Sequence, residues 1–364
     1  MKEAMVSMAT ATKIARILSK ANASPRQSPT EPVSDASTQE LLTANLKYKK
    51  LKIYAGPTRI RREFMSLSAE IIQKHRIAGK IAAEVRELMK NTVTESMPII
   101  DICEKTEALI RQKGGRPAFP CNVSINEIAA HYTSPPDDKS LVPHGALVKV
   151  DIGVHVDGYI ADTAVTVCLD REYDNLVVAA EDALKTGIKT IHAGLFTSQF
   201  GSAIQKTIES HGLRPVANLT GHQVARYVIH AGRSLPNVTH ISTNRVVANE
   251  VYAIEPFVTL KNAAGRVGSG KEAYIFRFLK QKTLRNEYAR KLCNFVMENF
   301  RTLPFAERWL LGVVPPDKHK VAFFELLSSK TVMAYPIFVE VSGKRVAQAE
   351  HSVLVTKDGC EVLT

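Results

Sequence analysis

Residues 148–167 read VKVDIGVHVDGYIADTAVTV, and they constrain the fold more than any other stretch of the chain. Apolar residues alternate with others on both sides of Asp157-Gly158, a dipeptide typical of two-residue turns between antiparallel strands. Such a turn fixes the register, so Gly153 faces Asp162, and Asp151 lies two residues along on the same face. The opposite face is expected to lie in the core and consists of Val148, Val150, Ile152 and Val154.

Two carboxylates side by side on an otherwise apolar hairpin repel each other, and burying them is costly. A positive charge between Asp151 and Asp162 would relieve both effects. A divalent metal is the natural candidate, and Gly153 is expected to leave room for it.

Composition narrows the class of protein. The five cysteines are scattered without a CxxC spacing, which argues against a zinc knuckle or a disulfide scaffold and favours the cytoplasm. No apolar run is long enough to span a bilayer, so we expect no membrane association. The net charge of +12 favours an acidic partner such as RNA, although a merely soluble basic surface explains it equally well.

The N-terminal part differs in composition from the rest of the chain. Residues 21–39 are rich in Ser, Pro, Thr and Ala without helical or strand period, so we expect 1–64 to be a disordered, basic extension. Its first twenty residues could form a short amphipathic helix that acts as a targeting segment. We favour two simpler interpretations, a dispensable tail or a true start at Met65.

Residues 65–364 read as one domain with a repeated pattern. Each half has two helices followed by antiparallel strands that carry two acids, and the second pair is Glu255 and Glu350. Helices are expected at 67–88, 98–113, 176–192 and 198–211. Strands are expected around 222–230 and 246–257, with a last hairpin at 345–364. The stretch 273–330 reads as an inserted helical subdomain.

Four acids and one histidine need a common explanation. Glu255 and Glu350 lie in apolar strands, as Asp151 and Asp162 do, and His222 lies in LTGHQVARYVIHAG. Each acid alone could pair with a lysine or arginine or face solvent. Because these strands contain so few basic residues, a shared metal site explains the set better. Four carboxylates and one imidazole suit two ions of Mn, Fe(II), Co or Zn.

Five segments resemble those of the type II methionine aminopeptidases of the archaeal-like form. They are GGRPAFPCNVSINEIAAHYTSP, VKVDIGVHVDGYIADTAVTV, NLTGHQVARYVIHAG, IEPF and VAQAEHSVLV. The resemblance runs from about Leu67 to Thr364, and 273–330 resembles the insertion that separates type II from type I enzymes. It implies the pita-bread α/β (α+β) fold for 65–364, with two pseudo-symmetric halves around a dinuclear metal centre.

The resemblance also implies five ligands for two divalent ions per chain, which could be Co, Mn, Fe(II) or Zn. Asp151 would hold one ion, and Asp162 and Glu350 would bridge both. His222 and Glu255 would complete the second.

Further residues match the family's substrate site. His131 and His230 match two histidines that contact substrate, and we expect them to donate hydrogen bonds to the peptide and the developing oxyanion. No residue near Ala273 aligns with a further pocket histidine. The positions that line the methionine pocket are matched by Phe119, Ile229 and Tyr335.

The implied reaction removes the N-terminal methionine from newly made proteins and prefers a small second residue. A bridging hydroxide would attack the scissile carbonyl, and Glu255 would shuttle the proton with His230 and His131 nearby. We expect a cytoplasmic monomer that acts on nascent polypeptides. Contact with the ribosome through the basic surface is a hypothesis from charge alone.

Two other functions stay open at this point. One is a related pita-bread enzyme that is specific for proline, although AAHYTSP and the insertion weigh against it. The other is a non-catalytic relative that binds RNA or ribosomes. Such relatives typically lose metal ligands, whereas all five positions are filled here.

Overall fold

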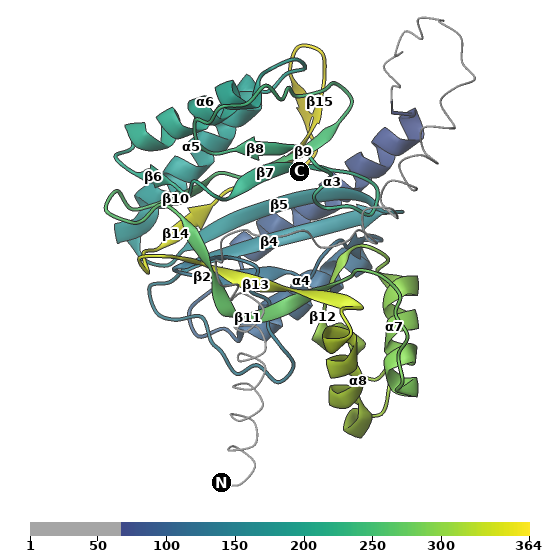
Figure 1. Cartoon of the computed structure of the whole chain (residues 1–364). Helices are drawn as coiled ribbons and strands as arrows, with labels where there is room; N and C mark the ends of the chain where they lie inside the picture. Colours follow the sequence, from purple (N-terminus) through teal and green to yellow (C-terminus); the bar gives the residue numbers. More distant parts are fainter. Residues whose placement is uncertain (1–66) are drawn as a thin grey trace, which may run out of the picture. The chain divides into compact units, whose positions relative to one another are not determined.

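The computed structural model describes residues 67–364, whose helices and strands are labelled in Figure 1. The expected extension at 1–64, with its short helix, lies outside the described residues and stays a prediction. Among residues 67–364, the structure contains no helix with the length and hydropathy needed to cross a membrane.

The first half begins with two helices, α3 (Ala69–Lys90) and α4 (Ile99–Gln112), close to the predicted ranges. Ser68 caps α3, because its hydroxyl accepts a hydrogen bond from the backbone N–H of Ile71. Pro98 lies at the N-cap of α4, one position before the first turn. Both helices bury an apolar stripe in the first hydrophobic core.

The predicted hairpin is present as β4 (Leu147–Val156) and β5 (Tyr159–Cys168). The two residues between the strands, Asp157 and Gly158, have φ angles of 52° and 87°. Both values are left-handed, as a tight type I′ turn requires, and the twist of this turn matches the twist of the strands. The Asp-Gly pair therefore sets the strand pairing.

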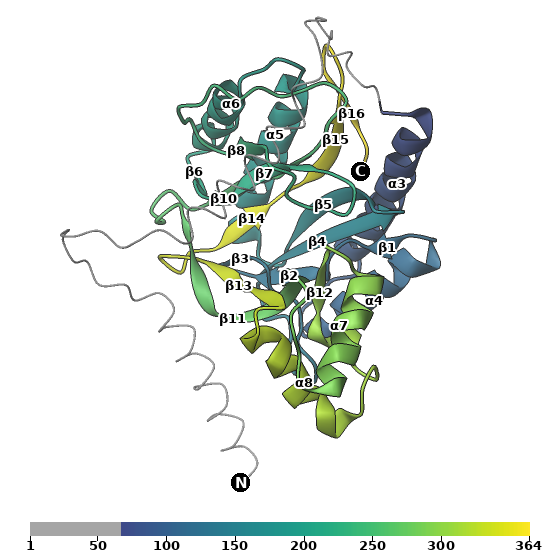
Figure 2. The ribbon, with the colours of Figure 1, turned by 45° about the vertical axis from the view of Figure 1, so that its right-hand side comes forward.

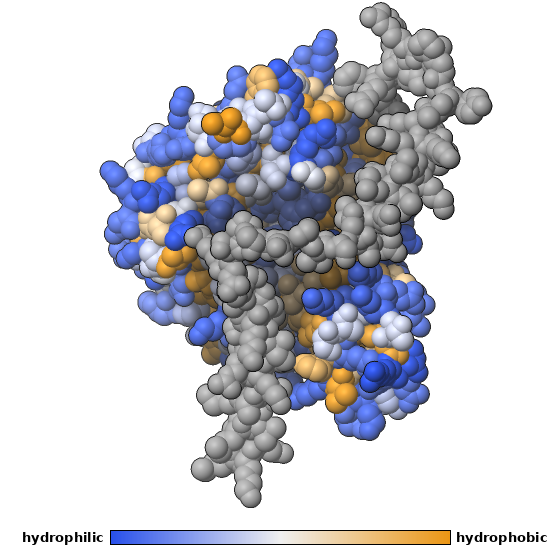
Figure 3. Space-filling view, in the orientation of Figure 1, coloured by the Kyte–Doolittle hydropathy of each residue, from blue (hydrophilic) through white to orange (hydrophobic). Residues whose placement is uncertain are grey.

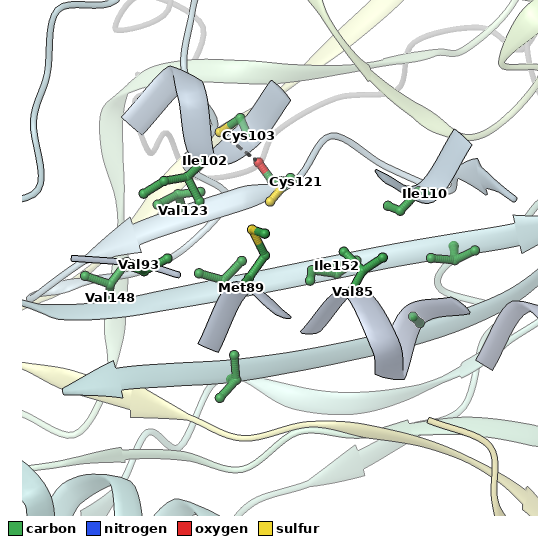
Figure 4. Close-up of a cluster of buried hydrophobic side chains, with 14 of the residues drawn as sticks. Val85, Met89, Val93, Ile102, Cys103, Ile110, Cys121, Val123, Val148 and Ile152 are labelled. Atoms are coloured by element: carbon green, nitrogen blue, oxygen red, sulfur yellow. Dashed lines mark hydrogen bonds between the residues drawn. The ribbon is translucent and has the colours of Figure 1, made fainter. Parts of the chain in front are cut away.

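The register of the hairpin is also the predicted one. Gly153 pairs with Asp162, and Asp151 pairs with Ala164, so the two acids share a face. The opposite face packs against α3 and α4, and Figure 4 shows part of this core. Its strand residues are fully buried: Val148, Val150, Ile152 and Val154. Core packing on one face thus fixes the position of the acids on the other.

Three short strands complete this half. They are β1 (Arg116–Pro117), β2 (Asn122–Ile125) and β3 (Ile128–Ala130). β1, β2 and β5 all pair with β4, which makes β4 the central strand of the first sheet.

The second half repeats two helices followed by antiparallel strands, as the sequence pattern predicts. After a single turn, η1 (Arg171–Tyr173), come α5 (Asp174–Thr190) and α6 (Thr197–Ser210). The larger sheet has the order β16-β15-β9-β7-β8. Its strands are β7 (Thr220–Val224), β8 (Ser234–Pro236), β9 (Val251–Ile254), β15 (His351–Val355) and β16 (Cys360–Val362). The smaller sheet contains β6 (Arg214–Pro215), β10 (Phe257–Thr259) and β14 (Val346–Gln348).

The insertion is less helical than the sequence suggests. Ala273–Phe278 belong to a long strand, β11 (Val267–Phe278), so the expectation of helical structure from 273 is wrong for these residues. The other elements of 273–330 are α7 (Glu287–Asn299), β12 (Pro304–Ala306), η2 (Glu307–Leu310) and α8 (Pro316–Ser328). The strand β13 (Val332–Glu340) follows them and pairs with β11. In two views α7 and α8 lie together, away from α5 and α6 (Figures 1 and 2).

A buried network of an ion pair and hydrogen bonds joins the insertion to the first half. Glu107 of α4 forms an ion pair with Arg308 and accepts a hydrogen bond of 2.7 Å from Nε1 of Trp309. Arg308 also donates to Oγ1 of Thr133 over 2.9 Å. Glu107 is 2% exposed and Arg308 is 8% exposed, so the pair is almost completely removed from water.

A seam of hydrogen bonds joins β5 to the start of β15, and so joins the two halves. Ala164 and Glu350 form a backbone bridge, with N···O distances of 3.4 and 3.1 Å. The backbone N–H of Asp162 donates to Oγ of Ser352 over 2.7 Å, and this hydroxyl donates back to the Asp162 carbonyl over 3.0 Å. The seam therefore brings Asp162 and Glu350 close together.

The described surface is mostly polar on the face that Figure 3 shows, where hydrophobic side chains form small, scattered patches. The most exposed large apolar residues lie on several elements and in several loops, among them Leu141, Ile241, Leu311 and Val321. Scattered exposure of this kind is normal for a globular protein.

Candidate metal centre

All ten residues that the sequence singles out line one cavity of about 230 Å³. The expected metal ligands among them are Asp151, Asp162, His222, Glu255 and Glu350. The expected substrate contacts are Phe119, His131, Ile229, His230 and Tyr335. Strands from both halves meet at this cavity, so residues that are far apart in the chain share one site.

The acids surround the His222 imidazole, which β7 positions. Nε2 of His222 lies 3.4 Å from Oε1 of Glu255 and 3.7 Å from Oδ2 of Asp162. Asp162, His222 and Glu350 each offer one ligand atom, and these atoms all lie within 4.8 Å of one another. Because Asp151 lies on the same hairpin face as Asp162, it extends this group.

Burial and mutual repulsion shift the protonation of the acids. Burial raises the pKa of Asp151 to about 7. Burial, and then the charge of Asp151, raise the pKa of Asp162 well above its usual range. Burial, and then the Asp162 charge, do the same for Glu255 and Glu350. The pKa of His222 falls to about 3, mainly through burial, so the ring is neutral and able to bind a metal.

Several of the carboxylate oxygens have no hydrogen-bond partner among residues 67–364. Oδ1 of Asp151, Oδ1 of Asp162 and Oε2 of Glu350 are buried without a hydrogen bond. Among the described residues, no lysine or arginine forms an ion pair with any of the four acids. Buried, unpaired carboxylate oxygens around a neutral imidazole fit divalent cations, and the residues present therefore suit a metal centre.

Gly153 does not leave open space beside the acids, and the expectation that it makes room for a metal is wrong. A Cβ atom built on Gly153 would lie 2.3 Å from Cε1 of Phe119. The missing side chain instead admits the Phe119 ring, which lines the cavity. Gly153 therefore shapes the cavity wall.

His131 has a left-handed backbone, with φ of 67°, and its ring packs against Tyr335 and Phe338. Burial lowers the pKa of His131 to about 4, so the ring is neutral near pH 7. Nδ1 lies 3.3 Å from the carbonyl oxygen of Pro336. Since a carbonyl only accepts, the proton is on Nδ1 and Nε2 is an acceptor. A neutral His131 is thus suited to accept a hydrogen bond from a peptide N–H, in contrast to the expected donor role.

His230 lies beside His222, with 4.3 Å between the ring centroids. Its pKa is lowered first by burial and then by the positive charge of Arg277. The neighbouring Ile229 is 8% exposed and packs in a cluster with Phe119.

The structure adds residues that the sequence did not indicate. Asn122 of β2 pairs with Asp151 of β4. Nε2 of Gln348 donates to Oε2 of Glu255 over 3.4 Å. Gln348 lies two residues before Glu350, and residues two apart on a strand face the same side. This spacing could have indicated Gln348 as a neighbour of the site. Ile275 of β11 lines the cavity in the region where no pocket histidine aligns.

Metal affinity should depend steeply on pH. Below about pH 7 Asp151 binds a proton that a metal must displace, and the pKa values of the other three acids are raised as well. His222 does not contribute to the pH dependence of metal affinity between pH 6 and 8, because its pKa is about 3. We expect Mn²⁺ affinity to fall by at least about tenfold when the pH drops from 7 to 6. Calorimetric titration at both pH values measures this change, and equal affinities would contradict it.

Comparison with known proteins adds independent information. Residues 73–357 match the model of metallopeptidase family M24. A methionine aminopeptidase of Methanothermobacter thermautotrophicus is 43% identical over 298 residues, which cover 81% of this chain and 99% of that protein.

Solved structures share the fold at lower identity. A thermophilic Arx1 superimposes with a TM-score of 0.70 at 16% identity, over 82% of this chain and 91% of that one. A methionine aminopeptidase from Thermotoga maritima gives a TM-score of 0.59 at 22% identity, over 82% and 98% of the two chains. At these identities the likeness concerns the fold alone.

Proposed function

The chain belongs to metallopeptidase family M24 and, within it, to the methionine aminopeptidases, and on this premise we propose that it removes the N-terminal methionine from newly made proteins. The observation that supports the reaction best is the convergence of five ligand-type side chains on one cavity, which no lysine or arginine of the described part of the chain lines. Four of the five are carboxylates with raised pKa values, which a divalent metal would hold in the charged form.

We assign two divalent ions to each chain. Asp151 would hold one ion, and Asp162 and Glu350 would bridge both. His222 and Glu255 would complete the second. Ions of Co, Mn, Fe(II) or Zn suit this oxygen-rich set with one imidazole. When bound, they would supply a water of lowered pKa and polarise the scissile carbonyl.

The protein's own side chains would handle the proton and the peptide. Glu255 would take the proton from the attacking water and pass it to the leaving amine, and Gln348 holds its carboxylate in place. His230 would donate a hydrogen bond to the developing oxyanion. His131 would accept one from the peptide N–H through Nε2.

The methionine side chain would occupy an apolar part of the cavity. Phe119, Ile229 and Tyr335 line it, and Gly153 admits the Phe119 ring. Apolar slots discriminate by roughly 1–3 kcal/mol per methylene, which suffices to favour methionine over shorter side chains. We expect a small second residue to be preferred.

A peptide assay tests the proposed function directly. Metal-loaded enzyme should release methionine from Met-Ala-Ser and leave Xaa-Pro peptides uncut. A chelator should stop the reaction. Cleavage of Xaa-Pro peptides with Met-Ala-Ser left intact would favour a proline-specific peptidase instead.

Replacing His230 by alanine should slow turnover without loss of metal. His230 is assigned to the substrate, so its removal should lower kcat by roughly 100-fold, as for other oxyanion donors. Metal analysis of the purified variant should give the wild-type content. His144→Ala is the matched control, because its side chain is 94% exposed. Loss of metal in His230→Ala would refute the substrate-binding role.

The cellular setting follows from the same proposal. The substrate is the N-terminal methionine of nascent polypeptides, and we place the enzyme in the cytoplasm as a monomer. The basic balance suggests contact with the ribosome. Removing residues 1–64 should weaken salt-sensitive sedimentation with ribosomes, and unchanged sedimentation would remove the support for a role of this extension.

A further inference from the structure

Among residues 67–364, one arginine contacts the seam between the two halves from the side of α3. Arg86 lies on α3, which packs across β4 and β5, and its side chain is only 11% exposed. It is not among the residues that line the metal cavity. The reaction described above gives it no role.

One nitrogen of this arginine reaches both strands of the seam. Nη1 of Arg86 donates to Oγ1 of Thr163 over 2.6 Å and lies 2.9 Å from Nδ1 of His351. A guanidinium only donates, so Nδ1 of His351 is the acceptor. Thr163 directly follows Asp162, and His351 directly follows Glu350. Arg86 therefore holds the residue after each of the two carboxylates assigned as bridging ligands.

The contact with Thr163 continues across the seam. Oγ1 of Thr163 donates to the backbone carbonyl oxygen of Glu350 over 2.8 Å. Because the hydroxyl proton is used in this bond, the oxygen is free to accept from Arg86. Arg86, Thr163 and Glu350 thus form a chain of two hydrogen bonds, which fixes the backbone of one assigned ligand relative to the strand of the other.

The charge of Arg86 also acts on the site. Its positive charge counteracts the rise in the pKa of Glu350 that burial and the neighbouring acids cause. The guanidinium is partly neutralised by Glu87, which lies 3.0 Å from Nη2. A role for Arg86 therefore rests on its hydrogen bonds alone.

We propose that Arg86 is a positioning residue that sets the separation of the Asp162 and Glu350 carboxylates and thereby the metal affinity of the site. The inference rests on the proposed function, because it takes these two acids as bridging ligands. Replacing a residue that contacts metal ligands without binding the metal typically changes metal affinity or activity by 10–100-fold.

The experiment compares Mn²⁺ binding by calorimetry in the full chain and in Arg86→Met. We expect the affinity for Mn²⁺ to fall by about 10–100-fold. Arg86→Lys keeps the charge but has a single ammonium group in place of the planar guanidinium. This variant should therefore bind Mn²⁺ with intermediate affinity. Thr163→Val removes the hydroxyl link and should weaken binding in the same direction. Combined with Arg86→Met, it should add little, because the two residues act through one chain of hydrogen bonds.

A second arginine on the same helix provides the matched control. Arg76 donates two hydrogen bonds to the carboxylate of Glu361, at 2.7 and 2.9 Å, which join α3 to β16, and neither residue bonds to Thr163, Glu350 or His351. Arg76→Met should lower thermal stability without changing the affinity for Mn²⁺. The proposal is overturned if Arg86→Met and Thr163→Val bind Mn²⁺ like the wild type, or if Arg76→Met loses as much affinity. If Arg86→Met does not fold, Thr163→Val decides alone.

The readout also separates this inference from the proposed function. A wild-type protein that binds Mn²⁺ but does not cleave Met-Ala-Ser would refute the peptidase proposal. The effect of Arg86 on metal binding would still be measured in the same titration.

Discussion

Glu350→Ala is expected to abolish both tight metal binding and turnover, with kcat/KM reduced by at least about 1000-fold, or ~4 kcal/mol of transition-state stabilisation. Glu350 is 2% exposed, and we propose it as a ligand of both ions, so its loss would remove one ligand from each. Asp162→Ala should behave alike. Metal analysis and the Met-Ala-Ser assay measure the two effects.

In the metal-free protein, the same substitution should raise thermal stability. Burial and neighbouring acids raise the pKa of Glu350, so its carboxylate opposes folding when no metal is bound. Metal-free Glu350→Ala should therefore melt at a higher temperature than metal-free wild type, and added Mn²⁺ should stabilise only the wild type. Glu272→Ala, on the exposed part of β11, is the control. Full turnover by Glu350→Ala would overturn the bridging assignment.

Glu107→Ala is expected to destabilise the metal-loaded protein by ~3–5 kcal/mol, because it leaves the buried guanidinium of Arg308 without its counter-charge. Two further hydrogen bonds to Glu107 are lost, from Nε1 of Trp309 and from the backbone N–H of Cys121. Urea denaturation at neutral pH measures the difference. The exposed Glu104 lies on the same helix, and Glu104→Ala should change stability by less than ~0.5 kcal/mol.

A double substitution separates the ion pair from simple loss of packing. Glu107→Leu combined with Arg308→Met replaces both charges by apolar groups of similar size. Such replacements are often neutral, so the double variant should be more stable than Glu107→Ala. If the double variant is the less stable of the two, the cost does not come from the unpaired guanidinium.

The first hairpin could be predicted from the sequence because its information is local. Asp157-Gly158 fixes the turn, the turn fixes the register, and the register places Asp151 and Asp162 on one face. The helices α3 to α6 were likewise predictable, since each shows a period of three to four apolar residues. The ten candidate residues come from segments that resemble a known family, and all of them line one cavity.

Features that depend on contacts between distant segments could not be predicted in this way. Nothing around Gly153 shows that Phe119 occupies the space beside it. The sequence does not show that Ala273–Phe278 belong to a strand, because β11 pairs with residues of β13 more than fifty positions away. The ion pair of Glu107 with Arg308 and the contact of Arg86 with His351 also join segments that are far apart in the sequence. Tertiary packing decides such features, and local sequence carries no signal for them.

The seam between Asp162 and Glu350 has a consequence for the order in which the chain folds. The hairpin with Asp151 and Asp162 is local and can form early, but the residues opposite it in the seam come almost two hundred positions later. Until that late segment docks, the early hairpin carries two repelling acids without compensation, so its native pairing is frustrated. Metal ions present during refolding should therefore accelerate the docking of the late segment, because they stabilise only the arrangement in which both segments have come together.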